Sequence, residues 1–252
     1  MDHGRSQRPS TLDVPKDLSF DPARLPPIDD PRYEVKFTAD VIDLPHVMAW
    51  ITAHRLGFRL SYPDRVVNNV YLDTPGLDAY YENLAGVSRR EKARYRWYGE
   101  THAPAKGTLE IKCRRDSIGW KWNARVNHPM DLDQLTWMAF HDQLRSHVDV
   151  PFQFLLDSQA FPALINRYRR SYYESRDGLL RVTVDRDIEL YPQVGRARPS
   201  FRFRAHSARA LVIEVKCAAR HRNIAAEALT QMPWRVSRHS KYALGIESLE
   251  NL

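Results

Sequence analysis

Polar and apolar positions alternate with a period of two residues along five short segments of the chain. Three of them contain Glu-x-Lys, at 34–36, 110–112 and 214–216, and the segments 94–98 (RYRWY) and 181–185 (RVTVD) keep the same alternation. On a β-strand, residues two apart share one face, so the charged side chains lie together and the residues between them point the other way. The alternation therefore predicts strands with one charged face and one apolar face packed on a core.

The remaining pattern divides the chain into further strands, turns and helices. Leu44, Val47, Met48 and Ile51 recur at helical spacing after Asp43, a residue type that favours helix starts. The expected strands are 32–39, 68–73, 90–100, 107–114, 120–126, 164–174, 179–190 and 210–218, and the expected helices are 43–54, 77–84, 131–147 (starting at Asp131 or Asp133), 152–159, 224–231 and 241–247. Strands dominate, their turns are short and helices lie between groups of strands, which indicates an α+β fold whose antiparallel sheet closes on itself.

Charge narrows the range of partners. The 252 residues can form one large or two small domains, and they carry 38 Lys and Arg against 31 Asp and Glu, a formal charge of +7. This balance favours nucleic acid, phosphorylated metabolites or an anionic membrane surface without choosing among them. Residues 1–31 are rich in Pro, Asp and Arg, so we expect a disordered N-terminal segment followed by a folded domain over 32–252.

The two cysteines and the targeting signals that a sequence can contain bear on the cellular compartment. Neither a secretory signal nor a membrane-spanning segment is recognisable in the sequence, so we expect a cytoplasmic protein. Cys113 and Cys217 each follow a Glu-x-Lys pattern and alternate with its charged residues. We expect both to be small, outward-packing residues with reduced thiols, because they form no disulfide framework and have no partners at zinc-ligand spacing.

The charged faces of the predicted strands point to a polyanion. A single Glu-x-Lys is most often a solvated strand face, but three copies in phase, joined by arginines, weaken that interpretation. Without a ligand the cations on such a face would repel one another, whereas each phosphate of a bound chain accepts several charge-assisted hydrogen bonds. If the faces meet inside a barrel or groove, they would hold a polyanion and a metal ion. The cations of this face are Lys36, Arg94, Arg96, Lys112, Arg181 and Lys216.

Two further basic segments have two interpretations each. Residues 168–173 (YRRSYY) are either a surface that stacks nucleotides or a strand on which Arg170 faces inward and Arg169 outward. The clean alternation favours the strand. Ser240 precedes a predicted helix, where it is either a simple N-cap or, with Lys241, part of a phosphate seat at the helix start.

In this order, the motifs resemble the VTC (vacuolar transporter chaperone) domain, the catalytic domain of polyphosphate polymerases in the triphosphate tunnel metalloenzyme superfamily. The resemblance covers about 32–245 and implies an antiparallel tunnel of about eight strands whose basic interior holds a triphosphate or polyphosphate chain. It is most specific where RYRWYG, LRVTVD and the final SKY follow one another. The segments that carry it are 32–37 (RYEVKF), 68–74 (NNVYLDT), 94–99 (RYRWYG), 110–112 (EIK), 168–170 (YRR), 180–185 (LRVTVD), 213–216 (IEVK) and 240–242 (SKY).

The resemblance also implies roles by position. Glu214 would help to hold a divalent metal, Mn²⁺ or Mg²⁺, with Glu34 and Glu110 as further candidates. Arg32 and Lys36 are both candidates for the basic residue of the first strand. The implied phosphate-binding residues are Arg32, Lys36, Arg94, Arg96, Lys112, Arg170, Arg181, Lys216, Ser240 and Lys241, and those that also act in catalysis are Arg94, Arg96, Lys112, Arg170, Arg181, Lys216 and Lys241.

One departure from the superfamily bears on the reaction. Hydrolases and cyclases of the superfamily typically begin with Glu-x-Glu-x-Lys, whereas this chain has Arg32 at the position of the first Glu. A base in place of an acid weakens metal binding and strengthens polyanion binding. We therefore expect a metal-dependent polyphosphate polymerase that uses ATP, rather than a triphosphatase or an adenylate cyclase.

Three other functions stay open. A tunnel-type triphosphatase would release orthophosphate, a non-catalytic polyphosphate or inositol-phosphate binder would bind without turnover, and a nucleic-acid-binding protein would show steep salt dependence. The last is least favoured, since the chain contains no recognised nucleic-acid module. Yeast-type polymerases of this family are larger chains with membrane-anchoring parts, so the resemblance also suggests a separate membrane protein as partner and a position at the inner face of a membrane.

Overall fold

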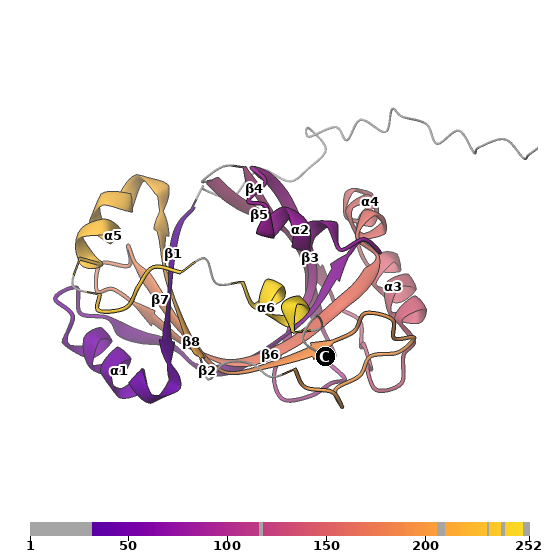
Figure 1. Cartoon of the computed structure of the whole chain (residues 1–252), viewed down its shortest axis with the longest axis horizontal. Coiled ribbons are helices and arrows are strands. Elements are labelled where there is room, and N and C mark those ends of the chain that lie inside the picture. Colours follow the sequence, from indigo (N-terminus) through magenta and orange to yellow (C-terminus); the bar gives the residue numbers. More distant parts are fainter. Residues whose placement is uncertain (1–31, 116–117, 206–209, 231, 238–239, 249–252) are drawn as a thin grey trace, which may run out of the picture.

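The strands form a closed antiparallel barrel (Figure 1). The computed structural model describes residues 32–115, 118–205, 210–230, 232–237 and 240–248, and the N-terminal segment expected over 1–31 lies outside them. Around the barrel the strand order is β1-β5-β4-β3-β2-β6-β7-β8, which confirms the predicted closed antiparallel sheet. The strands are β1 (Arg32–Asp40), β2 (Arg59–Asp73), β3 (Arg89–Tyr98), β4 (Gly107–Arg115), β5 (Ile118–Val126), β6 (Phe161–Glu174), β7 (Arg181–Pro192) and β8 (Ala210–Ala218).

Helices flank the barrel, which confirms the α+β class. In Figure 1, α1 and α5 lie on one side of the barrel and α3 and α4 on the opposite side. Among the described helices, none combines the length and the apolar character that crossing a membrane requires. The helices are α1 (Leu44–Ala53), α2 (Asp78–Leu84), α3 (Trp137–Ser146), α4 (Val150–Ser158), α5 (Arg222–Ala228) and α6 (Lys241–Glu247).

Strand β2 is much longer than its sequence predicts. It begins at Arg59 rather than at residue 68, and its residues 59–65 are exposed. This part contains Pro63, and its pairing with β6 shifts register on both sides of Tyr62. Proline cannot donate a hydrogen bond to the neighbouring strand, and the register shifts interrupt the alternation of polar and apolar residues. This half of the strand therefore cannot be recognised from the sequence.

Helix α3 starts later than predicted. It begins at Trp137 because the Thr136 hydroxyl accepts a hydrogen bond from the Ala139 N–H and caps the helix there. Asp131 and Asp133, the predicted starts, lie before it. The Asp131 carbonyl closes a turn by accepting from the N–H groups three and four residues on. A threonine cap thus takes the place of the predicted aspartate.

The outward faces of the strands carry the main hydrophobic cores. On one side, Val182 and Ile213 of the barrel pack with Ile51 of α1. On the other side, Tyr95 of β3 lies with its ring centroid 5.6 Å from that of Phe140 of α3. Apolar residues therefore point to the helices, and the charged residues that alternate with them point inward.

Both cysteines lie in these outer cores. Cys113 and Cys217 are 1% and 5% exposed, and each packs in the core on its own side of the barrel. Burial raises the pKa of both thiols. Their outward packing as small apolar residues is confirmed.

The last helix, α6, lies within the barrel rather than outside it (Figure 1). Its residues Tyr242 and Ile246 share a buried cluster with Leu164 of β6 and Val212 of β8. At Gly245 an added Cβ would lie only 2.4 Å from the Leu164 side chain. Only glycine lets the helix approach β6 this closely, so α6 fills part of the interior.

Candidate functional site

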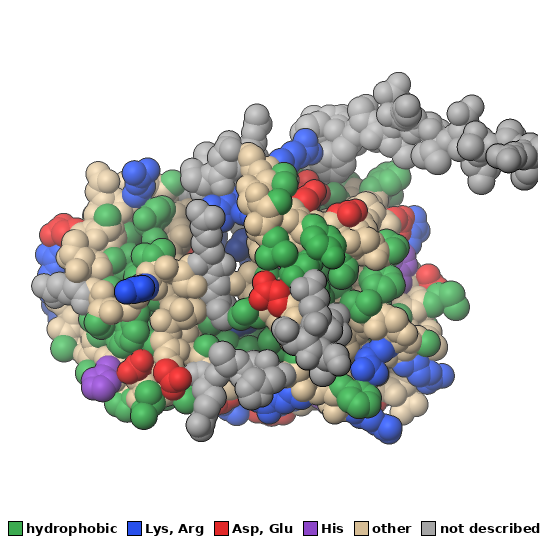
Figure 2. Space-filling view, in the orientation of Figure 1, with side chains coloured by type: hydrophobic (Ala, Val, Ile, Leu, Met, Phe, Trp, Pro, Cys, Tyr) green, Lys and Arg blue, Asp and Glu red, His purple; other side chains and the backbone are tan. Residues whose placement is uncertain are grey.

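The charged faces of the strands meet inside the barrel, where Figure 2 shows Lys and Arg side chains in a central hollow. Along β3, Arg90, Lys92, Arg94 and Arg96 share the inner face because alternate residues point to the same side. They line a cavity of about 260 Å³. Of the described residues that line it, two are Glu and twelve are Lys or Arg: Arg32, Lys36, Arg90, Lys92, Arg94, Arg96, Lys112, Arg114, Lys121, Arg170, Lys216 and Lys241.

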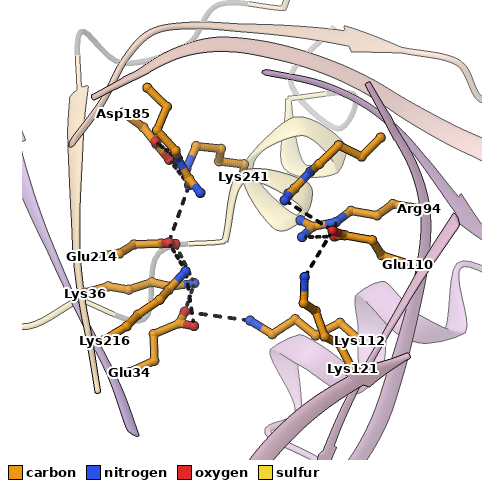
Figure 3. Close-up of polar contacts among 12 residues, drawn as sticks. Glu34, Lys36, Arg94, Glu110, Lys112, Lys121, Asp185, Glu214, Lys216 and Lys241 are labelled. Carbon is orange, nitrogen blue, oxygen red and sulfur yellow. Dashed lines mark hydrogen bonds and ion pairs between the residues drawn. The ribbon is translucent and has the colours of Figure 1, made fainter. Parts of the chain in front are cut away.

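Two glutamates and two lysines alternate on the wall formed by β1 and β8 (Figure 3). Lys36 Nζ lies 3.0 Å from Glu34 and 3.3 Å from Glu214, and Lys216 Nζ lies 2.8 Å from Glu214 and 3.7 Å from Glu34. Burial alone would raise the pKa of both carboxylates, but the nearby lysines, Lys216 above all, hold it well below the usual range. Burial lowers the pKa of Lys36, and the two glutamates raise it above its usual value on balance. Both acids and Lys36 are therefore charged at neutral pH.

On the facing wall, formed by β3, β4 and β5, one glutamate binds three cations. Arg94 donates to Glu110 Oε2 through Nε at 2.7 Å and Nη2 at 2.5 Å, while Lys121 and Arg96 reach Oε1 at 3.2 and 3.5 Å. Burial raises the pKa of Glu110, but Arg94 and Arg96 lower it by more, so this acid is also charged. Arg94 donates further to the Tyr71 hydroxyl at 3.1 Å. These contacts fix the guanidinium groups on the inner surface.

Helix α6 adds a third charged cluster. Lys241 Nζ donates to Asp185 Oδ2 at 2.6 Å, and Arg170 donates to both Asp185 oxygens at 2.5 and 2.7 Å. Asp185 is fully buried; burial raises its pKa, and Arg170 and Lys241 lower it below the usual range. Arg170 Nη2 also lies 3.4 Å from Glu214. The cluster fastens α6 to the barrel and connects it to the wall of β1 and β8.

Three lysines stand in one row across β3, β4 and β5. Lys112 pairs in register with Lys92 on one side and with Lys121 on the other. Burial and the neighbouring cations lower the pKa of Lys92 to about 7 and that of Lys112 to about 8, although Glu34 lies 3.7 Å from Lys112. In Figure 3 this Lys112–Glu34 contact joins the two walls. The lysine row carries positive charge that its acids do not fully compensate, so a bound anion would relieve its repulsion.

The structure brings nearly all the predicted site residues to this cavity. Glu110 lies at the inner surface behind Arg94, and Arg32 contributes an exposed side chain at the start of β1. Ser240 lines the cavity and its hydroxyl accepts from the Ala243 N–H at 3.3 Å, so it is an N-cap at the same time. The predicted residues that line the cavity are Arg32, Glu34, Lys36, Arg94, Arg96, Lys112, Arg170, Glu214, Lys216, Ser240 and Lys241.

Apart from Glu110, which lies behind Arg94, Arg181 is the predicted site residue that the structure does not bring to the cavity. It pairs with Lys216 in register and so shares the inner face, but it is the first residue of β7. Its side chain is 66% exposed and its Nε lies 3.0 Å from Glu174. The alternation places the residue on the correct face, and its position at the strand end keeps it outside the cavity.

Sequence reasoning missed five charged residues of the site, namely Arg90, Lys92, Arg114, Lys121 and Asp185. Lys92 lies two residues before Arg94, and Lys121 lies between two tryptophans of β5. Asp185 closes the LRVTVD motif and is the acid that holds Arg170. Strict alternation along each predicted strand would have found all five, because Arg90 alternates with Arg94 and Arg114 alternates with Lys112.

The carboxylates fit a metal that takes most of its ligands from phosphates. Among the described residues, no group of three or more His, Cys, Asp or Glu side chains is assembled at a spacing that could hold a metal ion. Glu34 and Glu214 lie close enough to share Lys36 and Lys216. Mg²⁺ bound with phosphates needs only one or two carboxylates from the protein, and this pair meets that requirement.

Of the comparisons with known proteins, the one with protein families agrees with the resemblance in the sequence. A family model described as the VTC domain matches residues 31–250. No curated protein matches the chain. Among solved structures, the chain is similar to the PH1819 protein from Pyrococcus horikoshii OT3, with 12% identity and a TM-score of 0.45 over 86% of this chain and 98% of that one. It is also similar to a chain of the Schizosaccharomyces pombe Mediator head module, with 9% identity and a TM-score of 0.39 over 79% and 89% of the two chains. Similarity at this level carries no functional conclusion.

Proposed function

Because this chain belongs to the VTC domain family, whose model spans nearly all of it, we propose that it is a polyphosphate polymerase. It would transfer the γ-phosphate of ATP to a growing polyphosphate chain inside the barrel. The observation that carries the proposal is the cavity lining, in which twelve described Lys and Arg side chains face two glutamates. A linear polyanion is the ligand class that such a surface fits, because each phosphate accepts charge-assisted hydrogen bonds from several cations.

The phosphates would lie between the two walls. The lysine row and Arg94 present cations from β3, β4 and β5, while Lys36 and Lys216 present them from β1 and β8. Five of these cations, Lys36, Arg94, Lys112, Lys121 and Lys216, contact acids beside them. We expect the phosphate oxygens to take over the lysine contacts, which would free one or both glutamates of the first wall.

Glu214, with Glu34 beside it, would then hold the divalent cation that accompanies the nucleotide. Such a cation, Mn²⁺ or Mg²⁺, supplies charge neutralisation of phosphate oxygens when bound. Glu110 is a weaker candidate, since Arg94 occupies it with two hydrogen bonds.

In the reaction, an oxygen of the terminal phosphate of the polyphosphate chain would attack the γ-phosphorus of ATP. The bond between this phosphorus and the β–γ bridging oxygen breaks, and ADP leaves with that oxygen. Arg94, Arg96 and Arg170, which line the cavity, would hold the transferring group in line and neutralise its charge. Catalysis would therefore depend on positioning and electrostatics, with no covalent intermediate on a side chain.

A product assay tests this function. The purified protein is incubated with ATP and Mn²⁺, and the products are resolved on a polyphosphate gel while free phosphate is measured in parallel. We expect a ladder of long chains in the wild type and none in Lys112→Ala or Glu214→Ala, with Arg169→Ala, an outward-facing cation paired with Glu100, as the matched control. Orthophosphate alone would show a triphosphatase. Binding without any product would show a polyphosphate-binding module.

A further inference from the structure

The inner face of the barrel continues beyond the cavity into a group of tyrosines. On β3, Tyr98 follows Arg94 and Arg96 at the same alternation. On β6, Tyr172 follows Arg170 in the same way, and on β2 Arg65 stands directly opposite Arg170. Tyr62 pairs in register with Tyr172. These four residues, Tyr62, Arg65, Tyr98 and Tyr172, form what we call the tyrosine cluster.

The tyrosine cluster is built around one guanidinium group. The Arg65 guanidinium carbon lies 4.8 Å from the ring centroid of Tyr62, 5.8 Å from that of Tyr98 and 5.9 Å from that of Tyr172. The Tyr62 and Tyr172 rings meet edge to face with their centroids 5.8 Å apart. Nevertheless Tyr62 is 53% and Tyr98 50% exposed, so both rings keep surface for a ligand.

The opposite end of the inner face has different chemistry. There β3 begins at Arg89, and the next residue, Arg90, pairs in register with Arg114. Arg32 lies with Arg90 and Arg114 around a second cavity of about 600 Å³. That cavity shares Lys36 and Lys112 with the first one. The phosphate-binding surface thus continues toward a cationic end, while the other end presents aromatic rings.

This asymmetry matches the asymmetry of a nucleoside triphosphate. Tyr98 lies about 6.6 Å further along β3 than Arg96, since a strand rises about 3.3 Å per residue. A ribose bridges a similar distance between the α-phosphate and the base. Aromatic side chains stack with any nucleobase, because every base has a π-face, and an arginine adds a cation–π contribution.

We propose that the tyrosine cluster is the seat of the nucleobase, so that ATP binds with its base on Tyr62 and Tyr98 and its phosphates directed past Arg96 and Arg170 into the cavity. This inference rests on the proposed function and adds the direction in which the nucleotide and the polyphosphate chain lie in the barrel. The nucleotide occupies the aromatic end, and the growing chain leaves toward the cationic end at Arg32, Arg90 and Arg114. Recognition by stacking tolerates any purine.

The test measures separately how much the base and the phosphates contribute to the affinity. Isothermal titration calorimetry measures the affinity of the full chain for ATP and, separately, for inorganic tripolyphosphate, in the wild type and in a Tyr62→Ala/Tyr98→Ala double variant. We expect the double variant to bind ATP about tenfold more weakly and to bind tripolyphosphate as the wild type does, since stacking contributes only to the base. Two variants serve as controls: the double variant Tyr62→Phe/Tyr98→Phe, which keeps both rings, and Tyr81→Ala, which removes a tyrosine 54% exposed on α2. Both should bind ATP normally.

Two results would overturn the nucleobase seat. Equal weakening of both ligands would mean that the rings only support the barrel, and unchanged ATP affinity would mean that the base lies elsewhere. The seat and the polymerase function fail separately. If the wild type makes a polyphosphate ladder and the double variant binds ATP as tightly as the wild type, only the nucleobase seat is rejected. If the double variant loses affinity for ATP alone and the wild type makes no ladder, only the polymerase function is rejected. A wild type that binds no ATP rejects both.

Discussion

The two walls of the cavity balance their charges differently. On the side of β1, β7 and β8, three acids (Glu34, Asp185 and Glu214) lie among Lys36, Arg170, Lys216 and Lys241, and every one of these acids contacts at least two cations. On the side of β3, β4 and β5, Glu110 is the single acid on the inner face of the described strands, and this face also carries the lysine row, Arg94 and Arg96.

This difference distinguishes ion pairs that stabilise the barrel from cations that are available to bind an anion. The first wall is nearly neutral, so its ion pairs can persist without a ligand and its acids are available to a metal. The second wall carries excess positive charge, which adds to the effect of burial, the larger cause, in lowering the pKa of Lys92 and Lys112. Changes to the first wall should therefore affect stability most, and changes to the second should affect binding and activity most.

Removal of Asp185 should have the largest effect on stability. In Asp185→Ala, Arg170 and Lys241 would keep buried charges without their partner, so we expect the free energy of unfolding to fall by about 3–5 kcal/mol. Glu174→Ala, which breaks the exposed pair with Arg181, should change it by less than about 1 kcal/mol. Urea denaturation measures both, and equal small losses would mean that the buried cluster does not fasten α6.

On the second wall, Arg94 should matter for activity. We expect Arg94→Ala to lower the rate of chain synthesis by about 10²-fold or more, since a fixed guanidinium at the transferring phosphate is lost. Circular dichroism should show that the variant is folded. A rate within a factor of a few of the wild type would contradict the assignment of phosphate contacts to this wall.

The lysine row should make phosphate binding depend on pH. With a pKa of about 7, Lys92 is largely neutral above that pH in the free protein and must gain a proton to bind an anion well. The affinity for tripolyphosphate should therefore fall as the pH rises from about 6.5 to 8.5, by roughly tenfold for one such group. Lys92→Met should flatten this dependence; an equally steep profile in the variant would assign it to other groups.

The same group has the opposite effect on the stability of the free protein. The unfolded chain, in which Lys92 has its usual pKa, binds more protons than the folded chain between about pH 7 and 10. The free energy of unfolding should therefore rise with pH in this window, and Lys92→Met should reduce the slope. Urea denaturation at pH 7 and 9 measures it, and a slope unchanged by the substitution would remove Lys92 as its cause.

The smallest effect is expected at Arg181. Its side chain is exposed and paired with Glu174, so we expect Arg181→Ala to change the affinity for tripolyphosphate by less than about fivefold. A loss as large as that of Lys112→Ala would mean that β7 moves its first residue toward the cavity when phosphate binds.

Alternation in the sequence was enough to predict which face each charged residue occupies. Lys36, Arg94, Lys112 and Lys216 all lie on the inner face as predicted, because the period of two is a property of the strand itself. The strand register, and how far inside the barrel a residue lies, cannot be predicted in this way, because both depend on how the strands pair. The sequence therefore could not show that Arg181 lies at the rim.

Three features could be recognised only in the folded structure. The first half of β2, irregular around Pro63, carries Tyr62 and Arg65 of the tyrosine cluster and has no readable alternation. The insertion of α6 into the barrel depends on the closeness of Gly245 to Leu164, which lie far apart in the chain. Which acid compensates which base follows from cross-strand neighbours, and these are set by the closed barrel.

A crystal structure of the protein with inorganic tripolyphosphate would test most directly whether the basic barrel interior is the phosphate site. We expect the phosphates between the two walls, with oxygens within hydrogen-bonding distance of Lys112, Arg94 and Lys216, and with the Lys112–Glu34 contact replaced by a phosphate contact. Tripolyphosphate bound on the outer surface, with the ion pairs of both walls intact, would contradict it.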